Sequence, residues 1–225
     1  MPARIFPDPQ TADHDGIVAI GGDFSPEILL AAYRQGIFPW PMTYKDRDGG
    51  ERRAPLTWFS PDPRAVLFFK DLHLPSRLVR SRQNVDLTYT WGQAFEKVVR
   101  ECARQPRPGQ RGTWITEPLL EGYVELHRRG QAWSAEVWEN ERLVGGIYGV
   151  CIEKFCSGES MFHLRSDASK LALAYAVKEL TARGCEWMDI QMLTPHMARL
   201  GAKELTRENF LTLCQQAMPT GSLPK

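Results

Sequence analysis

The sequence contains no apolar run of about eighteen residues, so no segment is expected to span a membrane. The first ten residues, MPARIFPDPQ, have no apolar core and do not resemble a secretory signal. The five cysteines form no CxxC pair and the five histidines form no HxxxH or HExxH pair, so no metal site is predicted. An odd number of cysteines without such spacing is typical of reduced thiols, and we expect a cytoplasmic protein.

The charge is nearly balanced, with a formal net charge of +1, which argues against a protein that coats nucleic acid. It is uneven, however, because residues 64–129 hold twelve Lys/Arg against seven Asp/Glu. Arg77, Arg80 and Arg82 form one local group. Such charges usually lie on solvated helix faces and loops. A protein that grips a short piece of RNA would also need only a few of them as phosphate contacts.

Proline, glycine and apolar periodicity divide the chain into a small N-terminal part and a longer second part. Ser25 as the cap and Pro26 in the first turn predict a helix that ends at Gly36. The polar stretch Lys45–Arg53 lies between prolines and is expected to be an exposed loop. We therefore expect a small domain over residues 1–60 and a second domain over residues 61–225.

Helices and strands alternate in the predicted second domain. Helices are expected over residues 95–104, 117–129 and 167–183, and strands over 132–139, 143–150, 154–161 and 187–192. The first two strands form a hairpin through a turn at Glu141-Arg142. This order predicts an α+β fold with a mixed sheet and flanking helices.

Polar and glycine residues interrupt three of these apolar strands. The glycines of GGIYGV at 145–150 indicate a close approach, either by a tight sheet crossing or by a ligand. Glu159 is either a structural carboxylate, bonded to Lys170 or a backbone amide, or an anionic ligand for a cationic amine. Strand alternation places Asp189 and Gln191 on one face, where they could guide a proton or lock neighbouring loops. His196 could act as a base, but a lone loop histidine is more often structural.

Several long motifs, in this order, resemble those of leucyl/phenylalanyl-tRNA–protein transferases. They are AYRQGIFPW at 32–40, WFSPDPR at 58–64, GTWIT at 112–116, EVW at 136–138, GESMF at 158–162, ASK at 168–170 and DIQ at 189–191. The resemblance covers nearly the whole chain, and motifs of this length are specific.

The resemblance implies a small N-terminal domain followed by a domain with an acetyltransferase-like (GNAT) fold. It implies transfer of Leu, Phe or another apolar amino acid from aminoacyl-tRNA to the α-amino group of proteins that begin with Lys or Arg. The donor is already an activated ester, so no cofactor or metal is implied. We expect a monomer that does not bind membranes.

The resemblance also implies the site residues, by position. The catalytic group is Asp189, Gln191 and Glu159, and the residues near the tRNA 3′ end and the aminoacyl ester are Trp40, Trp114, Tyr123 and Ser160. The aminoacyl pocket consists of Ile147, Cys156, Met161, Leu173, Ala176 and Met188. Arg77, Arg80 and Arg82 are candidates for contact with the body of the tRNA.

The chain departs from the family's usual residues at Trp133, Cys156 and Ala176, where a His and pocket aromatics are common. Loss of aromatics would enlarge the pocket unless Trp133 or Tyr175 refills it. The donor preference therefore stays open, and a changed donor amino acid is a hypothesis.

Two other functions fit the same elements. An acyl-CoA N-acetyltransferase usually holds pyrophosphate on backbone N–H groups of a Gly-rich loop at a helix start, but residues 162–170 contain no glycine. A non-catalytic binder of tRNA ends or protein N-termini would not need Asp189, Gln191 and Glu159.

Overall fold

The structure is a computed structural model that describes residues 5–40, 43–45, 51–53, 56–76, 78, 87–105 and 113–219. The chain divides into two compact units, one of residues 1–64 with 205–225 and the other of residues 65–204. None of the helices in the described part of the chain is long and apolar enough to cross a membrane.

The N-terminal unit is built on a three-stranded antiparallel sheet of order β1-β5-β2. Trp58 on the central strand is buried and donates its indole N–H to the Gly21 carbonyl at 2.9 Å, while Phe6 packs edge-on against it. The elements are a 3-10 turn at Pro9–Thr11, β1 (Ile17–Ile20), α1 (Pro26–Arg34), β2 (Phe38–Pro39), β3 (Thr43–Lys45), β4 (Glu51–Arg53), β5 (Thr57–Phe59) and α7 (Arg207–Ala217).

The C-terminal helix α7 belongs to this unit, whereas sequence analysis placed everything from residue 61 onward in one domain. Arg64 is 1% exposed and its guanidinium lies between the rings of Phe38 and Phe210, 4.5 and 4.4 Å from their centroids. The backbone N–H of Arg207 donates to Asp62 at 3.1 Å. These contacts join segments that lie far apart in the sequence, so apolar periodicity could not predict them.

Two local expectations for this unit are corrected. Ser25 occupies the N-cap position of α1, but its side chain makes no capping hydrogen bond, and its N–H instead donates to Asp23 at 2.7 Å. Part of the predicted loop Lys45–Arg53 is paired as β3 and β4, and residues 46–50 lie outside the described residues. Backbone pairing needs no apolar face, so the polar composition did not exclude it.

The second unit contains two sheets, of order β10-β9-β8-β7 with β11 also on β9, and of order β12-β6-β13. Its strands are β6 (Arg64–Phe68), β7 (Leu87–Trp91), β8 (Ala132–Glu139), β9 (Arg142–Ile152), β10 (Phe155–Cys156), β11 (Ser160–His163), β12 (Trp187–Gln191) and β13 (Lys203–Leu205). Its helices are a 3-10 turn at Phe69–Asp71, α3 (Phe95–Arg104), α4 (Glu117–Arg128), α5 (Ala168–Ala182) and α6 (Pro195–Arg199).

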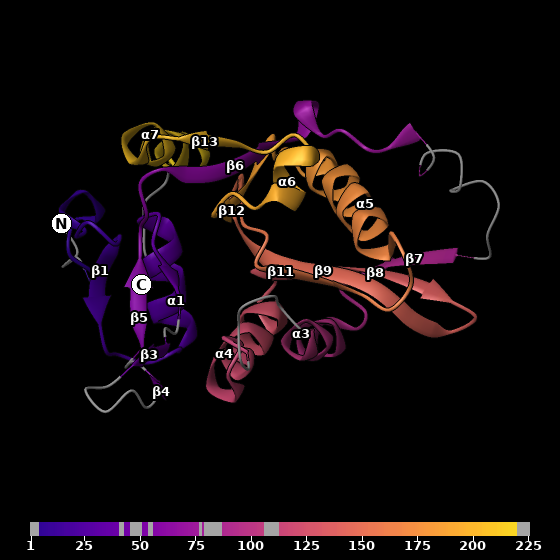
Figure 1. The fold of residues 1–225 in the computed structure, drawn as a ribbon, viewed down its shortest axis with the longest axis horizontal. Coiled ribbons are helices and arrows are strands. Elements are labelled where there is room, and N and C mark those ends of the chain that lie inside the picture. The colour runs from indigo at the N-terminus through magenta and orange to yellow at the C-terminus, as the bar shows by residue number, and fades with distance from the viewer. Residues whose placement is uncertain are drawn as a thin grey trace. The chain divides into compact units, whose positions relative to one another are not determined.

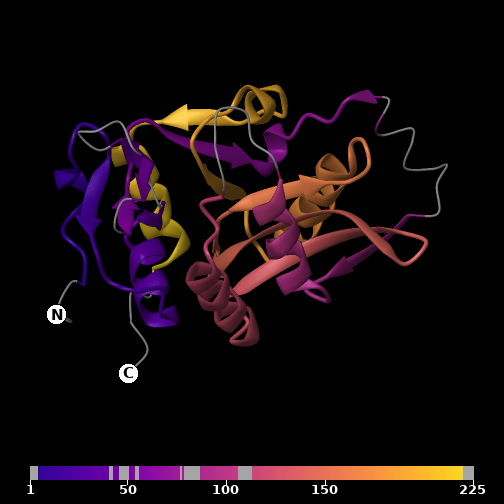
Figure 2. The same ribbon diagram turned by 60° about the horizontal axis from the view of Figure 1, so that its bottom comes forward.

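Helices cover both faces of the larger sheet, with α5 on one side and α3 and α4 on the other (Figure 1; Figure 2). A Cβ at Gly145 would lie 2.6 Å from the Cβ of Ala168 on α5. A Cβ at Gly146 would lie 2.8 Å from Phe162 and 3.0 Å from Val98 on α3. The first two glycines of 145–150 therefore serve close helix packing, which supports the crossing interpretation over a ligand contact.

The strand predicted over residues 154–161 is wrong as a single element. A turn at Glu153 and Lys154 returns the chain as β10, and the chain then leaves β10 at Ser157 before β11 begins. Gly158 lies against Met188, where a Cβ would be 2.5 Å from the sulfur. The described pairs are antiparallel apart from one parallel bridge between Ser157 and Asp189. The predicted α+β class is confirmed.

Candidate active site

The candidate site forms where the segment between β10 and β11 meets β12. The Ser157 N–H donates to the Val150 carbonyl at 2.9 Å, and the Gly158 N–H donates to the Asp189 carbonyl at 2.8 Å. Next along the chain, the Glu159 N–H donates to the Tyr148 carbonyl at 2.9 Å. The segment is thus held on both sides by backbone hydrogen bonds, which fixes the direction of the Glu159 side chain.

The Glu159 carboxylate is partly buried and accepts hydrogen bonds from two hydroxyl groups. Tyr123 on α4 donates to Oε2 at 3.1 Å, and Ser157 donates to Oε1 at 2.7 Å. Lys170, one partner considered from the sequence, pairs instead with Asp167 at 2.5 Å. Tyr123, predicted to lie near the ester, is therefore brought into contact with the predicted catalytic carboxylate.

Asp189 and Gln191 are brought together, but not by the alternation that the sequence suggested. A bulge interrupts the β12–β6 ladder between them, and Gln191 has a left-handed backbone with φ of 60°. The Gln191 N–H donates to Asp189 Oδ1 at 3.0 Å. Both side chains are buried, with exposed fractions of 0% for Asp189 and 6% for Gln191. Asp189 therefore stabilises an otherwise unfavourable backbone conformation at its neighbour.

The side-chain amide of Gln191 has two possible orientations. In one, Nε2 lies 3.4 Å from Glu159 Oε1, a long hydrogen bond. In the other, Nε2 donates to the carbonyls of Ile190 at 3.0 Å and Gly158 at 3.2 Å. We adopt the second, because it makes two hydrogen bonds of ordinary length and the network decides amide orientation. It turns Gln191 Oε1 toward Glu159, so two acceptors face the same space.

The six predicted pocket residues gather in one apolar cluster of the second unit. Five of them are at most 4% exposed, and Met161 is a partly buried neighbour of the cluster. Gly158 packs directly against this cluster and so brings it next to the acceptor group, because a Cβ there would lie 2.5 Å from Met188 and 3.8 Å from Ile147. The buried members are Ile147, Cys156, Leu173, Ala176 and Met188.

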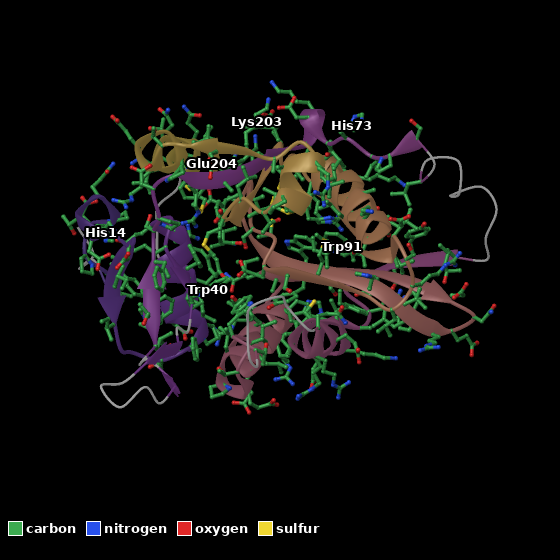
Figure 3. The ribbon with its side chains drawn as sticks, in the orientation of Figure 1. His14, Trp40, His73, Trp91, Lys203 and Glu204 are labelled. Atoms are coloured by element: carbon green, nitrogen blue, oxygen red, sulfur yellow. The ribbon has the colours of Figure 1, made fainter. Side chains whose placement is uncertain are left out.

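Trp133, where the chain departs from the family's usual residue, is part of the core. It is 3% exposed, its indole N–H donates to the Val150 carbonyl at 3.3 Å, and its ring stacks on Trp91 at 5.2 Å. The guanidinium of Arg183, at the end of α5, lies 4.4 Å from the Trp91 centroid. Trp91, labelled in Figure 3, therefore lies between α5 and the sheet. A Cβ at Gly149 would lie 2.8 Å from Trp133, so the facing glycine accommodates the indole.

The predicted tRNA-end residues are distributed over both units. Trp40, labelled in Figure 3, belongs to the N-terminal unit. Its backbone N–H donates to the Thr57 carbonyl at 2.9 Å, and its ring packs edge-on against Phe38. Trp114 is buried just before α4 in the second unit, and Ser160 begins β11. Arg77, Arg80 and Arg82 lie outside the described residues.

Other charged residues have ordinary structural environments. Arg100 forms ion pairs with Glu96 and Glu117, and Arg104 pairs with Glu101, as solvated helix charges commonly do. Burial, reinforced by the nearby cations Lys170 and Arg199, lowers the pKa of His196. No group of three or more His, Cys, Asp and Glu residues in the described ranges is arranged to hold a metal ion.

The contact of Ser157 with Glu159 was not predicted from the sequence. Its side chain is buried, donates to Glu159 and accepts the Val150 N–H at 3.2 Å. The signal was present, because Ser157 lies next to Gly158 in the segment that carries Glu159.

A surface hollow of about 500 Å³, lined by Thr88, Thr90 and Trp138 among others, includes none of the predicted site residues.

Comparison with known proteins places the chain among transferases that use aminoacyl-tRNA. The family model described as leucyl/phenylalanyl-tRNA protein transferase matches residues 66–215, and the model of its N-terminal domain matches residues 22–62. The chain belongs to the leucyl/phenylalanyl-tRNA–protein transferase family. It is accordingly an aminoacyltransferase enzyme.

Relatives that bear this family's name match over nearly their whole length. The relative from Maridesulfovibrio salexigens is 46% identical over 95% of this chain and 86% of its own. The relative from Myxococcus xanthus is 44% identical over 96% of this chain and 88% of its own. A weaker likeness is to the structure of L-PGS from Bacillus licheniformis. It has a TM-score of 0.42 at 13% identity and covers 71% of this chain and 55% of that one.

Proposed function

We propose that this chain moves Leu, Phe or another apolar amino acid from tRNA to the α-amino group of proteins that begin with Lys or Arg. Family membership supports the reaction class. The acceptor side is carried by the Glu159 carboxylate and, in the amide orientation adopted above, by Gln191 Oε1 next to it, close to the apolar cluster. Two acceptors so close together are suited to a group with several N–H donors, such as an amine.

The reaction forms a C–N bond between the acceptor amine and the aminoacyl carbonyl and breaks the ester C–O bond to the tRNA ribose. The proton that the amine nitrogen loses when it becomes an amide leaves with the ribose oxygen as a hydroxyl group. An α-amino group has a reference pKa of about 8 and must lose a proton before it attacks. In our proposal Glu159 binds the ammonium form and takes its proton. Gln191 Oε1 then accepts a hydrogen bond from the neutral amine and orients its lone pair. Asp189 acts by holding the Gln191 backbone, and such positioning can contribute several kcal/mol.

The donor side chain would occupy the apolar cluster, with Trp114, Tyr123 and Ser160 beside the ester. Trp40 is assigned to the terminal adenosine, and Arg77, Arg80 and Arg82 to tRNA phosphates. An apolar pocket distinguishes one methylene by only about 1–3 kcal/mol, so more than one donor amino acid should react. Trp133 lies in the same cluster as Cys156 and Ala176, and we propose that it refills part of the space left by the missing aromatics.

We further propose that the protein is a cytoplasmic monomer that needs no added cofactor. The five free cysteines support a reducing compartment. An activated ester donor supports catalysis without metal, so transfer should continue in the presence of EDTA. Light scattering of the purified chain would test the monomer.

The decisive experiment is a transfer assay with charged Leu-, Phe-, Met- and Trp-tRNA as donors. Each is mixed with a peptide that begins with Arg and with a matched peptide that begins with Ala. Transfer of Leu or Phe to the Arg peptide alone supports the proposal, and a preference for Met or Trp would show that the pocket has changed its donor. Transfer from acetyl-CoA in place of any aminoacyl-tRNA would contradict it.

A further inference from the structure

Three of the five cysteines lie together on the core side of the site. Cys151 on β9 and Cys156 on β10 are direct partners in the antiparallel register. Cys185 comes two residues before β12 and belongs to the same apolar core as Cys156, and Cys151 packs against that core. The Cys156 thiol donates to the Trp187 carbonyl at 2.9 Å, which ties β10 to the start of β12.

The three thiols lie close together. The Cys185 thiol lies within hydrogen-bond reach of those of Cys151 and Cys156. Two cations act on it, Lys154, whose Cε lies 4.0 Å from where a Cβ at Gly184 would be, and Arg183, whose guanidinium also pairs with Glu179 at 3.0 Å. Contact with the Cys151 thiol, and then with that of Cys156, lowers the pKa of the Cys185 thiol, and the two cations act in the same direction. The Cys185 contact, together with burial, raises the pKa of Cys151.

The members of this thiol group differ in access to solvent. Cys156 is 0% exposed and Cys185 is 2% exposed, whereas Cys151 is partly exposed. A small oxidant can therefore approach from the side of Cys151. Cys156 is held in the core by its 2.9 Å hydrogen bond to the Trp187 carbonyl, whereas the Cys151 thiol makes only a 3.8 Å contact with the Glu153 carbonyl, so Cys151 is the neighbour freer to move toward Cys185.

We propose that this thiol group is a site of oxidation by hydroperoxides, in which Cys185 reacts first and Cys151 then forms a disulfide with it. The Cys185 thiolate attacks the terminal oxygen of the peroxide and the O–O bond breaks, so that hydroxide leaves from hydrogen peroxide or alkoxide from an alkyl hydroperoxide, which yields a sulfenic acid on Cys185. The Cys151 sulfur then attacks the Cys185 sulfur, the S–O bond breaks, and the Cys151 proton leaves with the hydroxyl as water. One equivalent of peroxide is reduced for each disulfide formed.

Oxidation here would alter the base of the candidate site. Ser157 directly follows Cys156, and Asp189 lies four residues after Cys185. A new link between β9 and Cys185, two residues before β12, would shift the Ser157–Asp189 bridge, so oxidation should lower transfer activity. This consequence depends on the proposed function, whereas formation of the disulfide does not.

The test uses the reduced full-length protein, titrated with hydrogen peroxide and analysed by differential alkylation and peptide mass spectrometry. A Cys151–Cys185 peptide should form at peroxide doses that leave Cys102 on α3 and Cys214 on α7 unmodified. Cys185→Ser should abolish it, and Cys151→Ser should leave a Cys185 sulfenic acid that a cyclic dione traps. Cys102→Ser and Cys214→Ser are the matched controls and should not change the yield. Oxidation of Cys102 or Cys214 ahead of Cys185, or a Cys156–Cys185 disulfide instead, would overturn the proposal.

A second measurement needs no variant and so does not depend on whether Cys185→Ser folds. The ultraviolet absorbance of the reduced native protein should show a thiolate already present at about pH 6, where an ordinary thiol is protonated. Thiolate absorbance that appears only as the pH approaches about 8.5 would contradict it. Dithiothreitol should restore transfer activity to the oxidised protein, and a disulfide that forms without any loss of transfer would refute the regulatory consequence alone.

Discussion

Glu136 and Glu159 are two carboxylates of the same unit in contrasting environments. Glu136 on β8 is 0% exposed and accepts hydrogen bonds from Thr90 and Ser134, each at 2.5 Å, and from the Ala94 N–H at 3.3 Å. Glu159 is partly exposed and accepts from Ser157 and Tyr123. Of the two carboxylates, only Glu159 is partly exposed, and it lies next to the side chain of Gln191.

The difference shows that burial of a carboxylate does not by itself indicate a site. Ala94 is the N-cap of α3 and has no side chain that could cap the helix, so Glu136 accepts its N–H from a neighbouring strand. A carboxylate at a helix N-terminus also interacts favourably with the helix dipole. Glu136 is thus structural, whereas Glu159 and Gln191 are the pair that we propose binds an amine.

The largest effect is expected from Asp189→Ala, which removes the acceptor that holds the Gln191 backbone. A misplaced Gln191 should lower kcat/KM for transfer by about 100-fold, the scale of a 1 Å misplacement. The measurement is transfer of radiolabelled Leu to an Arg peptide, normalised to folded protein by circular dichroism. Asp167→Ala, which removes an acidic residue at the start of α5, is the control. Equal activity of the two variants would mean that Asp189 plays no positioning role.

Glu136→Ala should have the opposite profile, with a large loss of stability and normal transfer per folded molecule. It leaves three donors without their acceptor, and unsatisfied buried groups cost about 1–3 kcal/mol each, so the free energy of unfolding should fall by at least about 3 kcal/mol. Urea unfolding measures this, and Glu121→Ala on the exposed face of α4 is the control. A selective loss of transfer in the Glu136 variant would break the contrast with Glu159.

Glu159→Gln sharpens the comparison because it preserves size and one acceptor but removes the charge. Transfer should fall by about tenfold, less than the roughly 10²–10⁴-fold that a full general base contributes, because an α-amino group with a pKa of about 8 is already partly neutral. The free energy of unfolding should change by less than about 1 kcal/mol. Glu136→Gln serves as the matched variant and should lower stability without lowering transfer. If Glu159→Gln retains full activity across the pH range, Glu159 does not take the proton of the amine.

The sequence predicted the bounds of those elements whose residue pattern depends only on neighbouring positions in the chain. The strand Ala132–Glu139 and the helix Phe95–Arg104 have the predicted bounds, because alternation in the first and helical periodicity in the second extend through the whole element. Glu136 was not singled out, since its role depends on Thr90 and Ala94, more than forty positions away in the chain. An alternating strand pattern records burial but not the identity of the partners.

Three predicted site residues come together in the structure, but their geometry was not predicted. Glu159, Asp189 and Gln191 were named from the sequence, but the bulge between the last two was not, because alternation assumes a regular strand. The break at Ser157 in the strand expected over residues 154–161 was not predicted either, since it depends on backbone pairing with Asp189, which is distant in the sequence. The roles of these residues remain predictions for the assays above.

The smallest effects are expected from removing one hydroxyl beside each carboxylate, Thr90→Val for Glu136 and Ser157→Ala for Glu159. Thr90 donates to Glu136 and accepts from the Trp138 indole at 2.7 Å, and Ser157 donates to Glu159 and accepts from the Val150 N–H. Each variant loses one donor and one acceptor, so each should lose about 1–2 kcal/mol of stability by urea unfolding.

The two variants should differ only in transfer. Ser157→Ala should lower kcat several-fold, because Glu159 loses the donor on the oxygen that faces Gln191, whereas Thr90→Val should leave kcat unchanged. Stability then acts as the internal control, since it falls similarly in both. An equal effect on transfer would mean that the two carboxylates influence the reaction only through the fold, and the distinction between Glu136 and Glu159 would fail.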